Sequence, residues 1–397
     1  MKINQKLIVA LLIALLFGTM LYPVSSFENI IVIKIDDDFD SRINFFMKLG
    51  HMPSLSACIV KNDSVVWSDS YGFYDLKQKK SASQNTVYMV GSISKMFTAL
   101  AIMQLYEKGL FDLDDNISKY LPFHISNPKY PEVNITFRML LAHQSSLADS
   151  SISLFLIFSL LGYPYNWFNE FLKPGGKIYN PRNWMDYPPG EDQEYSSLGY
   201  EILGYLVEKI SNQTFQSYCE NNIFDPLDMN SSSFYISDFN INIIAIPYYW
   251  LMGKYIKLPF YENRNYAAGG LKSTIRDLSH FLIVHLNDGI YNNTRLLNKS
   301  TIDIMQIIQY PNGSDGFAWK FRKFSDGRTY LTHNGTIPGY HSRVSIFPQD
   351  RIGIIFLYNQ NNNIFVRENI RFIGKIEKYA FLKVEELLYE KGYSFKQ

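Results

Sequence analysis

The chain has 397 residues, of which 47% are hydrophobic and 16% aromatic, so it can bury a large core in one big domain or in two lobes. Its 38 basic and 37 acidic residues leave a formal net charge of +1, which excludes the electrostatic footprint of a nucleic-acid-binding protein. Its two cysteines, Cys58 and Cys219, are too few for a disulfide framework or a metal cluster, and we expect buried free thiols. No spacing such as His-Glu-x-x-His occurs, so the sequence predicts neither a metal site nor a cofactor.

Residues 1–26 differ in composition from the rest of the chain. Lys2 and Lys6 precede a charge-free, mostly apolar run, and residues 24–26 are small enough to suit a signal peptidase. The run is shorter than the roughly 20 residues that span a bilayer comfortably. Two interpretations stay open, a cleaved export signal and an uncleaved N-terminal membrane anchor. Either one predicts that residues 27–397 lie outside the cytoplasm.

The next segments predict a helix followed by a β-hairpin. Apolar side chains recur at helical spacing over residues 39–47, behind the acidic residues 36–40, which indicates a surface helix with negative charge at its N-terminus. Residues 55–60 and 65–71 are two strand-like runs, and the turn-prone residues 61–63 connect them.

The segment from Gly91 to Phe97 opens a second helix, whose apolar residues recur at helical spacing until Gly109, a plausible C-cap. Ser92 falls on the first turn, and Lys95 lies one turn further on the same face, so its amine can reach the Ser92 hydroxyl. A desolvated lysine can take the proton of a serine, and the free N–H groups at a helix N-terminus can stabilise an oxyanion. A capped helix with an exposed lysine has the same pattern, so the pair needs support from elsewhere in the chain.

The middle of the chain holds one similar pair and a strongly apolar run. Ser126 and Lys129 repeat the Ser-x-x-Lys spacing, but the proline between them breaks any helix and leaves no pre-organised pair. Thr136 caps a short helix that leads to His143, which we interpret as a structural hydrogen-bonding residue. Residues 152–161 are almost wholly apolar, which favours a core helix, with a wall for an apolar acyl group as the alternative.

Tyr195 stands between a turn at residues 188–191 and a helix predicted over residues 198–210. A phenol in this place could shuttle a proton if a nearby cation lowers its pKa, although a packing role is the simpler interpretation. Residues 267–270 contain two adjacent glycines, which predicts a tight turn before a helix expected over residues 275–286.

The last part of the chain predicts a sheet and a closing helix. Residues 330–333, 342–347 and 352–358 are strand-like, and residues 348–351 join the last two as a hairpin loop. An amphipathic helix is expected from about residue 367 to residue 391.

Three separated motifs, taken in their order, resemble those of the serine β-lactamase-like and penicillin-binding-protein superfamily. The chain is most similar there to class C β-lactamases and their esterase and D-aminopeptidase relatives. Ser92–Lys95 matches the family's Ser-x-x-Lys, Tyr195–Ser197 its Tyr-x-Asn, and His333–Gly335 its Lys-Thr-Gly or His-x-Gly strand motif. The resemblance spans roughly residues 38–390.

The resemblance implies an α/β sandwich, with an antiparallel sheet flanked by helices and an inserted all-helical lobe. The α/β lobe would comprise about residues 27–115 and 262–397, and the helical lobe about residues 116–261. The active site would lie in the cleft between the two lobes.

The resemblance also implies roles for individual residues. Ser92 would be the acylated nucleophile, Lys95 its activating base or proton relay, and Tyr195 the general base and acid. The remaining site comprises expected substrate-binding residues and an oxyanion hole formed by two backbone N–H groups. The substrate-binding residues are Ser197, His333, Asn334 and Gly335, and the oxyanion hole uses Ser92 and Thr336.

The implied function is an exported serine hydrolase that forms an acyl-enzyme with an ester, a small amide or a peptide. Ser197 stands where the family usually has asparagine, and His333 replaces a lysine whose fixed charge suits a substrate carboxylate. Both departures make a β-lactamase less favoured. The alternatives are a penicillin-binding D,D-carboxypeptidase or β-lactamase, and a catalytically silent binding protein with the same fold. We expect a small-molecule or peptide substrate and no nucleic acid, and membrane attachment through the N-terminal segment stays open.

Overall fold

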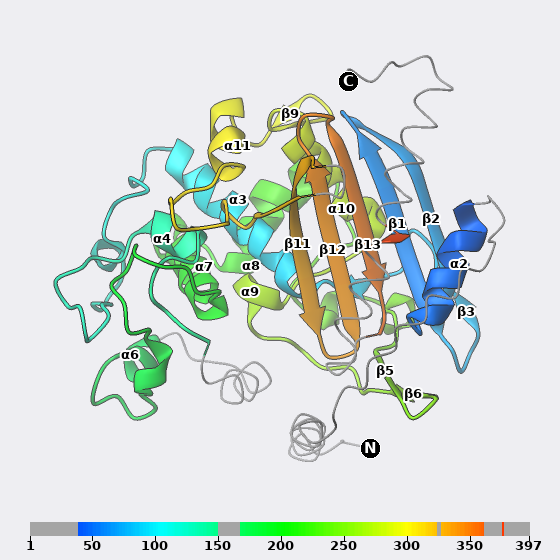
Figure 1. The fold of residues 1–397 in the computed structure, drawn as a ribbon, viewed down its shortest axis with the longest axis horizontal. Helices are drawn as coiled ribbons and strands as arrows, with labels where there is room; N and C mark the ends of the chain where they lie inside the picture. The colour runs from blue at the N-terminus through cyan, green and yellow to red at the C-terminus, as the bar shows by residue number, and fades with distance from the viewer. Residues whose placement is uncertain (1–38, 150–166, 324–326, 361–374, 377–397) are drawn as a thin grey trace.

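A seven-stranded antiparallel sheet forms one half of the molecule, in the strand order β10-β11-β12-β13-β1-β2-β3 (Figure 1). The computed structural model describes residues 39–149, 167–323, 327–360 and 375–376. The strands of the sheet are β1 (Ser54–Lys61), β2 (Ser64–Asp75), β3 (Lys80–Ser81), β10 (Lys320–Lys323), β11 (Thr329–Ile337), β12 (Tyr340–Phe347) and β13 (Ile352–Tyr358). Pairing of β1 with β13 joins the first described hairpin to the last described strands, so the sheet closes over a long separation in sequence.

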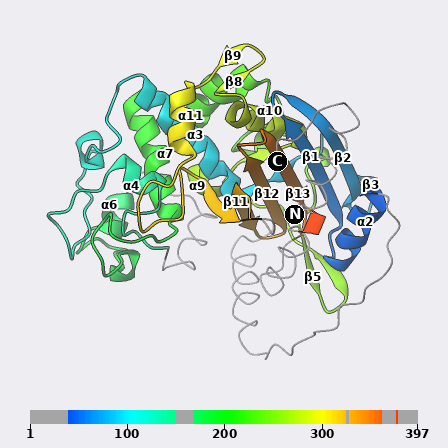
Figure 2. The ribbon, with the colours of Figure 1, turned by 45° about the horizontal axis from the view of Figure 1, so that its top comes forward.

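Helices cover the sheet and form the other half of the molecule. They are α2 (Phe39–Leu49), α3 (Ser94–Glu107), α4 (Phe137–Leu141), α6 (Trp167–Leu172), α7 (Ser197–Ser211), α8 (Phe215–Cys219), α9 (Tyr266–Gly269), α10 (Ile275–Leu286) and α11 (Lys299–Met305), and the 3-10 turn η1 (Gly91–Ile93) leads into α3. Short strand pairs are β4 (Tyr88–Met89) with β7 (Lys272–Ser273), β5 (Tyr248–Leu251) with β6 (Lys254–Lys257), and β8 (Ile290–Tyr291) with β9 (Thr294–Arg295). Helices α4, α6 and α7 lie on the side away from β1–β3 (Figures 1 and 2).

The alternation of side chains along β1 divides the core into two layers. Cys58 and Val60 face the larger apolar cluster, which contains α3 and α10, whereas Ala57 and Ile59 face a smaller cluster under α2. Both faces of β1 are therefore covered, which explains why nearly the whole strand is buried. Helix α3 is buried almost all round, since it lies between the sheet and the other helices.

The structure confirms most of the elements expected from the sequence. The hairpin, the helix behind Ser92, the helix that Thr136 caps, the helix after Tyr195 and the last strands all form, and both cysteines are buried free thiols. Gly109 follows α3 with φ of +70°, as a glycine at a helix C-terminus does. Strand β11 is longer than expected, because it continues past His333 to Ile337.

The expected lobe boundaries stay a prediction, but the structure refines their contents. The hairpin β5–β6 lies within residues 116–261, so this range is mainly helical rather than entirely so. This hairpin lies against the sheet, as shown by the hydrogen bond that the Tyr248 N–H donates to the carbonyl oxygen of Asn359, just after β13.

Several expectations fall outside the described residues. They are the N-terminal segment, the apolar run at residues 152–161 and the closing helix, of which only Lys375 and Ile376 are described, both helical. Within the described ranges, none of the helices has the length and apolar character needed to cross a bilayer.

The close approach of β11 to the residues before α3 requires a glycine. A Cβ atom at Gly335 would stand 1.9 Å from the carbonyl oxygen of Val90 and 2.3 Å from Ser342 Oγ. Ser342 Oγ donates a hydrogen bond to the same Val90 oxygen at 2.6 Å. Moving either oxygen away from a Cβ at position 335 would therefore break this hydrogen bond. Gly335 therefore sets how closely the sheet packs against the segment that carries Ser92.

We predict that Gly335→Ala lowers the free energy of unfolding by about 1–3 kcal/mol, because β11 must move away from Val90. Urea unfolding of the purified variant measures the effect. Gly109→Ala is the control, since a Cβ there meets nothing within 4 Å and the cost comes only from its φ of +70°. An unchanged unfolding midpoint for Gly335→Ala would show that the sheet does not pack as tightly as described.

Candidate active site

Ser92 and Lys95 lie at the junction between η1 and α3. The Lys95 side chain is completely buried, and its nitrogen Nζ lies 3.3 Å from Ser92 Oγ. The same Nζ donates to Ser197 Oγ at 3.2 Å and to the carbonyl oxygen of Ala268 at 2.7 Å. The expected contact between the Lys95 amine and the Ser92 hydroxyl is thus present, and segments far apart in the sequence meet at one nitrogen.

Gly91 and Ser94 shape the turn that presents Ser92. Gly91 has φ of +55°, in the left-handed region that favours glycine. Ser94 Oγ donates to the carbonyl oxygen of Gly91 at 2.7 Å and accepts the Leu271 N–H at 2.9 Å. These bonds fasten the turn to the segment after α9, and Ser92 remains partly exposed at the N-terminus of α3.

Tyr195 lies beside Lys95, immediately before α7. Lys95 Nζ is 4.9 Å from the centroid of the Tyr195 ring, and the His143 ring packs on Tyr195 with centroids 4.5 Å apart. Among the described residues, no hydrogen bond joins the Tyr195 hydroxyl to Ser92 or Lys95. The structure therefore places the Tyr195 ring next to the Ser92–Lys95 pair without a direct bond from its hydroxyl.

Asp149 fixes the N-terminus of α7, and the sequence analysis missed it. Its carboxylate accepts the Ser197 N–H at 2.7 Å and the Leu198 N–H at 3.1 Å. Ser196 Oγ accepts the Gly199 N–H at 3.0 Å as the N-cap. A carboxylate at a helix N-terminus also interacts favourably with the helix dipole. Since Asp149 lies 48 residues before Ser197, no local pattern could have revealed this contact.

Helix α9 presents the Ala268 carbonyl group to Lys95. The Ala268 N–H donates to Glu201 Oε1 at 2.8 Å, and Thr98 Oγ1 donates to the carbonyl oxygen of Ala267 at 2.6 Å. Burial raises the pKa of Glu201 to about 8, while the Ala268 N–H and the Lys95 charge oppose the rise. Burial thus shifts Glu201 toward its neutral form near pH 7, and no ion pair to Lys95 is present in the described part of the chain.

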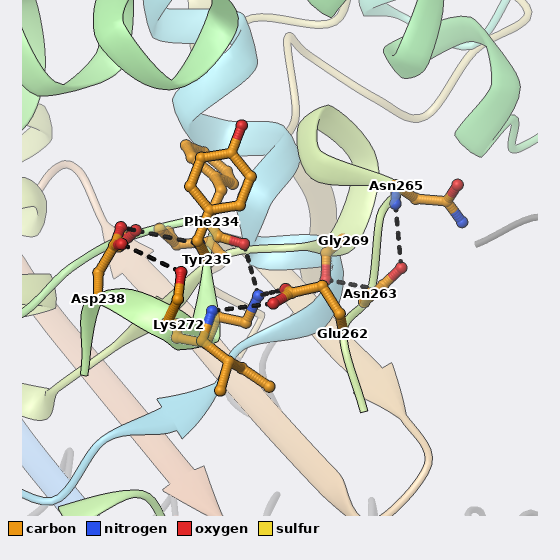
Figure 3. Close-up of polar contacts among 12 residues, drawn as sticks. Phe234, Tyr235, Asp238, Glu262, Asn263, Asn265, Gly269 and Lys272 are labelled. Atoms are coloured by element: carbon orange, nitrogen blue, oxygen red, sulfur yellow. Dashed lines mark hydrogen bonds and ion pairs between the residues drawn. The ribbon is translucent and has the colours of Figure 1, made fainter. Parts of the chain in front are cut away.

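A polar network beside α9 holds the Ala268 carbonyl group in this position (Figure 3). The buried Lys272 ammonium group forms an ion pair with Glu262 and donates to the carbonyl oxygen of Phe234 at 2.5 Å. Asn263 Nδ2 donates to the carbonyl oxygen of Gly269 at 2.9 Å. Burial lowers the pKa of Lys272, and the charge of Glu262 opposes this shift. The network therefore holds both ends of the segment that carries the Ala268 carbonyl.

Strand β11 directs its predicted substrate-binding residues to opposite faces of the sheet. Leu331 belongs to the apolar cluster that contains α3, whereas Tyr330 belongs to the cluster under α2. Because strand side chains alternate, His333 and Gly335 share the face of Leu331, and Asn334 shares the face of Tyr330. The Asn334 side chain therefore lies on the face of the sheet opposite to that of Leu331, and its role in substrate binding stays a prediction. Three consecutive residues of a strand cannot all face one site.

The backbone of β11 passes directly beside Gly91. A Cβ atom at Gly91 would stand 3.0 Å from the backbone nitrogen of Thr336. The Thr336 amide thus lies next to the residue that precedes Ser92. The oxyanion hole made of the Ser92 and Thr336 N–H groups stays a prediction.

Two buried histidines near the site carry no charge at neutral pH. His333 Nδ1 contacts the carbonyl oxygen of Ala318 at 2.7 Å, to which it donates. Burial, aided by the charges of Lys95 and Lys320, lowers the pKa of His333 to about 3. Burial also lowers the pKa of His143 well below its ordinary value, and His143 Nδ1 accepts the Ser196 N–H at 3.1 Å. His143 is thus a hydrogen-bonding residue, as its sequence context indicated.

The candidate reacting groups of the site are a serine, a lysine and a tyrosine. No group of three or more His, Cys, Asp or Glu in the described ranges is placed to hold a metal ion. A partly exposed serine at a helix N-terminus, a buried lysine amine beside it and a neighbouring tyrosine together can perform nucleophilic acyl transfer. The fold and this arrangement define the class of serine hydrolases built on an antiparallel sheet with a helical region.

Comparison with known proteins shows the family. A family model described as Beta-lactamase matches residues 39–376, so the chain belongs to the Beta-lactamase family. The curated relative Protein flp of Staphylococcus aureus is 28% identical over 328 residues, which cover 81% of this chain and 63% of that protein. The chain therefore spans less than two thirds of the length of this relative.

Solved structures show the same fold. The octameric penicillin-binding protein homologue from Pyrococcus abyssi matches with a TM-score of 0.69 and 26% identity, over 81% of this chain and 72% of that one. A class C beta lactamase from Rhodobacter sphaeroides matches with a TM-score of 0.65 over 87% of this chain and 99% of that one, and its 16% identity supports the fold alone. The predicted superfamily and the α/β fold class with an antiparallel sheet are both confirmed.

The low pKa of His333 makes a prediction about acid stability. Its folded pKa of about 3 lies below its ordinary value of 6.5, so as pH falls through 6.5 the unfolded chain binds a proton that the folded chain does not. The protein loses stability over this window, by up to about 1.4 kcal/mol per pH unit for one histidine. We predict that His333→Gln, which can still donate to Ala318, flattens this slope by the contribution of one proton.

Urea unfolding at a series of pH values between about 6 and 4 measures the slope. The exposed His124→Gln is the matched control, because it removes a histidine without removing a buried one. Identical slopes for wild type and His333→Gln would mean that His333 takes up its proton in the folded protein as readily as in the unfolded chain.

Proposed function

We propose that this protein is a serine hydrolase that forms an acyl-enzyme on Ser92. The observation that carries the proposal is the buried Lys95 nitrogen, 3.3 Å from Ser92 Oγ, with no ion pair among the described residues. A lysine held in this way can accept and return the serine proton without being locked to a carboxylate. Membership of the Beta-lactamase family supports the same chemistry.

In the proposed reaction, Lys95 or Tyr195 takes the proton of Ser92 while Oγ attacks the substrate carbonyl carbon. The new C–O bond forms, and the carbonyl π electrons move to the oxygen, which the Ser92 and Thr336 N–H groups stabilise. The bond to the leaving group then breaks, and Tyr195 or Lys95 returns the proton to that group. Water attacks the acyl-enzyme in the same manner, releases the acid and restores Ser92.

The proposed substrate is an ester, a small amide or a peptide rather than a β-lactam. Ser197 Oγ accepts a hydrogen bond from Lys95 Nζ at 3.2 Å. The substrate would therefore meet a short hydroxyl group at this position instead of the longer amide of an asparagine. His333, neutral at pH 7, presents no fixed positive charge. The penicillin-binding and β-lactamase alternatives find support in the names of the structural neighbours, and the experiment below separates them from the proposal.

We predict that a fluorophosphonate probe labels wild-type protein covalently and that Ser92→Ala abolishes the labelling. The probe reacts only with an activated serine, and mass spectrometry of the labelled peptide identifies its position. Ser126→Ala, in the second Ser-x-x-Lys sequence, is the matched control and should label fully. Tyr195→Phe should label more slowly, by a factor of about 10² or more if Tyr195 carries a proton in the reaction.

Turnover of a p-nitrophenyl ester and of a chromogenic cephalosporin by the same samples then identifies the reaction class. Ester hydrolysis that depends on Ser92 supports the proposal, whereas faster turnover of the cephalosporin, or stable acylation by it, supports the alternative. A folded wild-type protein that does not label would contradict the hydrolase function and leave a binding role.

We also propose that residues 1–26 direct the protein out of the cytoplasm. The support is the sequence pattern of this segment, namely two lysines before an apolar run that ends in small residues. When the chain is expressed with and without residues 1–26, we predict that only the longer form reaches the extracytoplasmic fraction. The mass of the exported form then distinguishes a cleaved signal from an anchor. Equal retention of both forms in the cytoplasm would contradict the proposal.

A further inference from the structure

An ammonium group that the proposed reaction does not use lies beside Tyr195. Lys320 is the first residue of the edge strand β10, and its Nζ is 4.7 Å from the centroid of the Tyr195 ring. Lys95 Nζ is 4.9 Å from the same ring. The Tyr195 ring therefore has two lysine nitrogens close to its centroid, one from the buried lysine that contacts Ser92 and one from a lysine that is only partly buried.

The Lys320 ammonium group has no ion pair among the residues that the structure describes. The acidic residue that pairs with Lys320 along the backbone is Asp315, through an isolated β-bridge. Its carboxylate is buried and accepts a hydrogen bond from Ser314 Oγ at 3.1 Å, and it acts on Lys320 only over a longer distance. Within the described ranges, the Lys320 side chain contacts the Tyr195 ring, a weak partner for an ammonium group.

The charge of Lys320 also affects the pKa of other side chains of the site. It contributes to lowering the pKa of both His143 and His333, although burial is the larger cause for each. Because these two histidines are neutral at pH 7, they neither repel an anion strongly nor attract one. Of the two lysines whose charge acts on both histidines, Lys95 is buried, whereas Lys320 is open to solvent in part and carries its charge on a flexible side chain.

We propose that Lys320 is a specificity-determining residue that binds a carboxylate carried by the substrate of Ser92; this inference rests on the proposed hydrolase function. A carboxylate bound at Lys320 would displace water from a partly buried ammonium group, where the attraction is stronger than in bulk water. It would also hold the substrate against Tyr195, the residue next to the reacting centre. The substrate class is thus an acidic ester, small amide or peptide.

The test compares acids with their own methyl esters as substrates. In one pair the carboxylate lies in the leaving group, namely 4-acetoxybenzoate and methyl 4-acetoxybenzoate. In the other pair it lies in the acyl group, namely monophenyl glutarate and its methyl ester. The measured quantity is the ratio of kcat/KM for the acid to kcat/KM for the methyl ester, which cancels any general effect of a substitution on the enzyme.

We expect Lys320→Met to lower this ratio about tenfold in at least one pair, because a charged contact to the substrate is lost. Lys320→Arg should restore most of the ratio, and Lys320→Glu should lower it further. Lys323→Met is the matched control. It removes the same charge from an exposed position at the far end of β10 and should leave the ratio as in wild type. The pair that responds shows whether the carboxylate belongs to the leaving group or to the acyl group.

Two results would overturn the inference while leaving the hydrolase function intact, which fluorophosphonate labelling of each variant verifies. The first is an unchanged ratio in both pairs. The second is an equal loss for acids and methyl esters together with a shifted pH profile, which would mean that Lys320 acts on Tyr195 and not on the substrate. If wild-type protein does not label at Ser92, the proposed function fails and the inference falls with it.

Discussion

Burial of the Lys95 side chain is the constraint on which the site depends. A buried ammonium or amine group is costly unless its hydrogen bonds are satisfied, and Lys95 meets this requirement with oxygens from Ser92, Ser197 and Ala268. These oxygens belong to the start of α3, the start of α7 and helix α9. The three elements must therefore converge on one point, and the half of the molecule beyond the sheet is arranged around that convergence.

Each of the converging segments is itself held by contacts outside the site. Asp149 satisfies the N–H groups at the start of α7, and the Lys272–Glu262 pair with Asn263 holds the segment around α9 (Figure 3). Gly335 lets β11 approach the turn before α3 without a clash. Each support is a hydrogen bond, an ion pair or a close backbone contact, so the side chains of the candidate site are held in place without a ligand, as the proposed catalysis would require.

Burial decides which ionisable side chains around the site are neutral. Burial keeps His143 and His333 neutral, and it moves Glu201 toward its neutral form. The Lys95 and Lys320 nitrogens both lie close to the Tyr195 ring, and the Lys95 side chain is fully buried whereas Lys320 is partly open to solvent. This division separates a lysine suited to proton transfer from one suited to recognition of an anion.

The sequence by itself determined what depends on local spacing. The periodicity of α3, the cap at Thr136, the first hairpin and the one-turn separation of Ser92 and Lys95 are properties of neighbouring residues, and the order of three motifs pointed to the superfamily. Only the tertiary structure decided which groups complete the site. The Ala268 carbonyl lies 173 residues from Lys95, and the face on which Asn334 lies follows from packing on both sides of β11. Hydrogen bonds over such separations leave no periodic pattern in the chain, because they form only once the sheet and helices have packed.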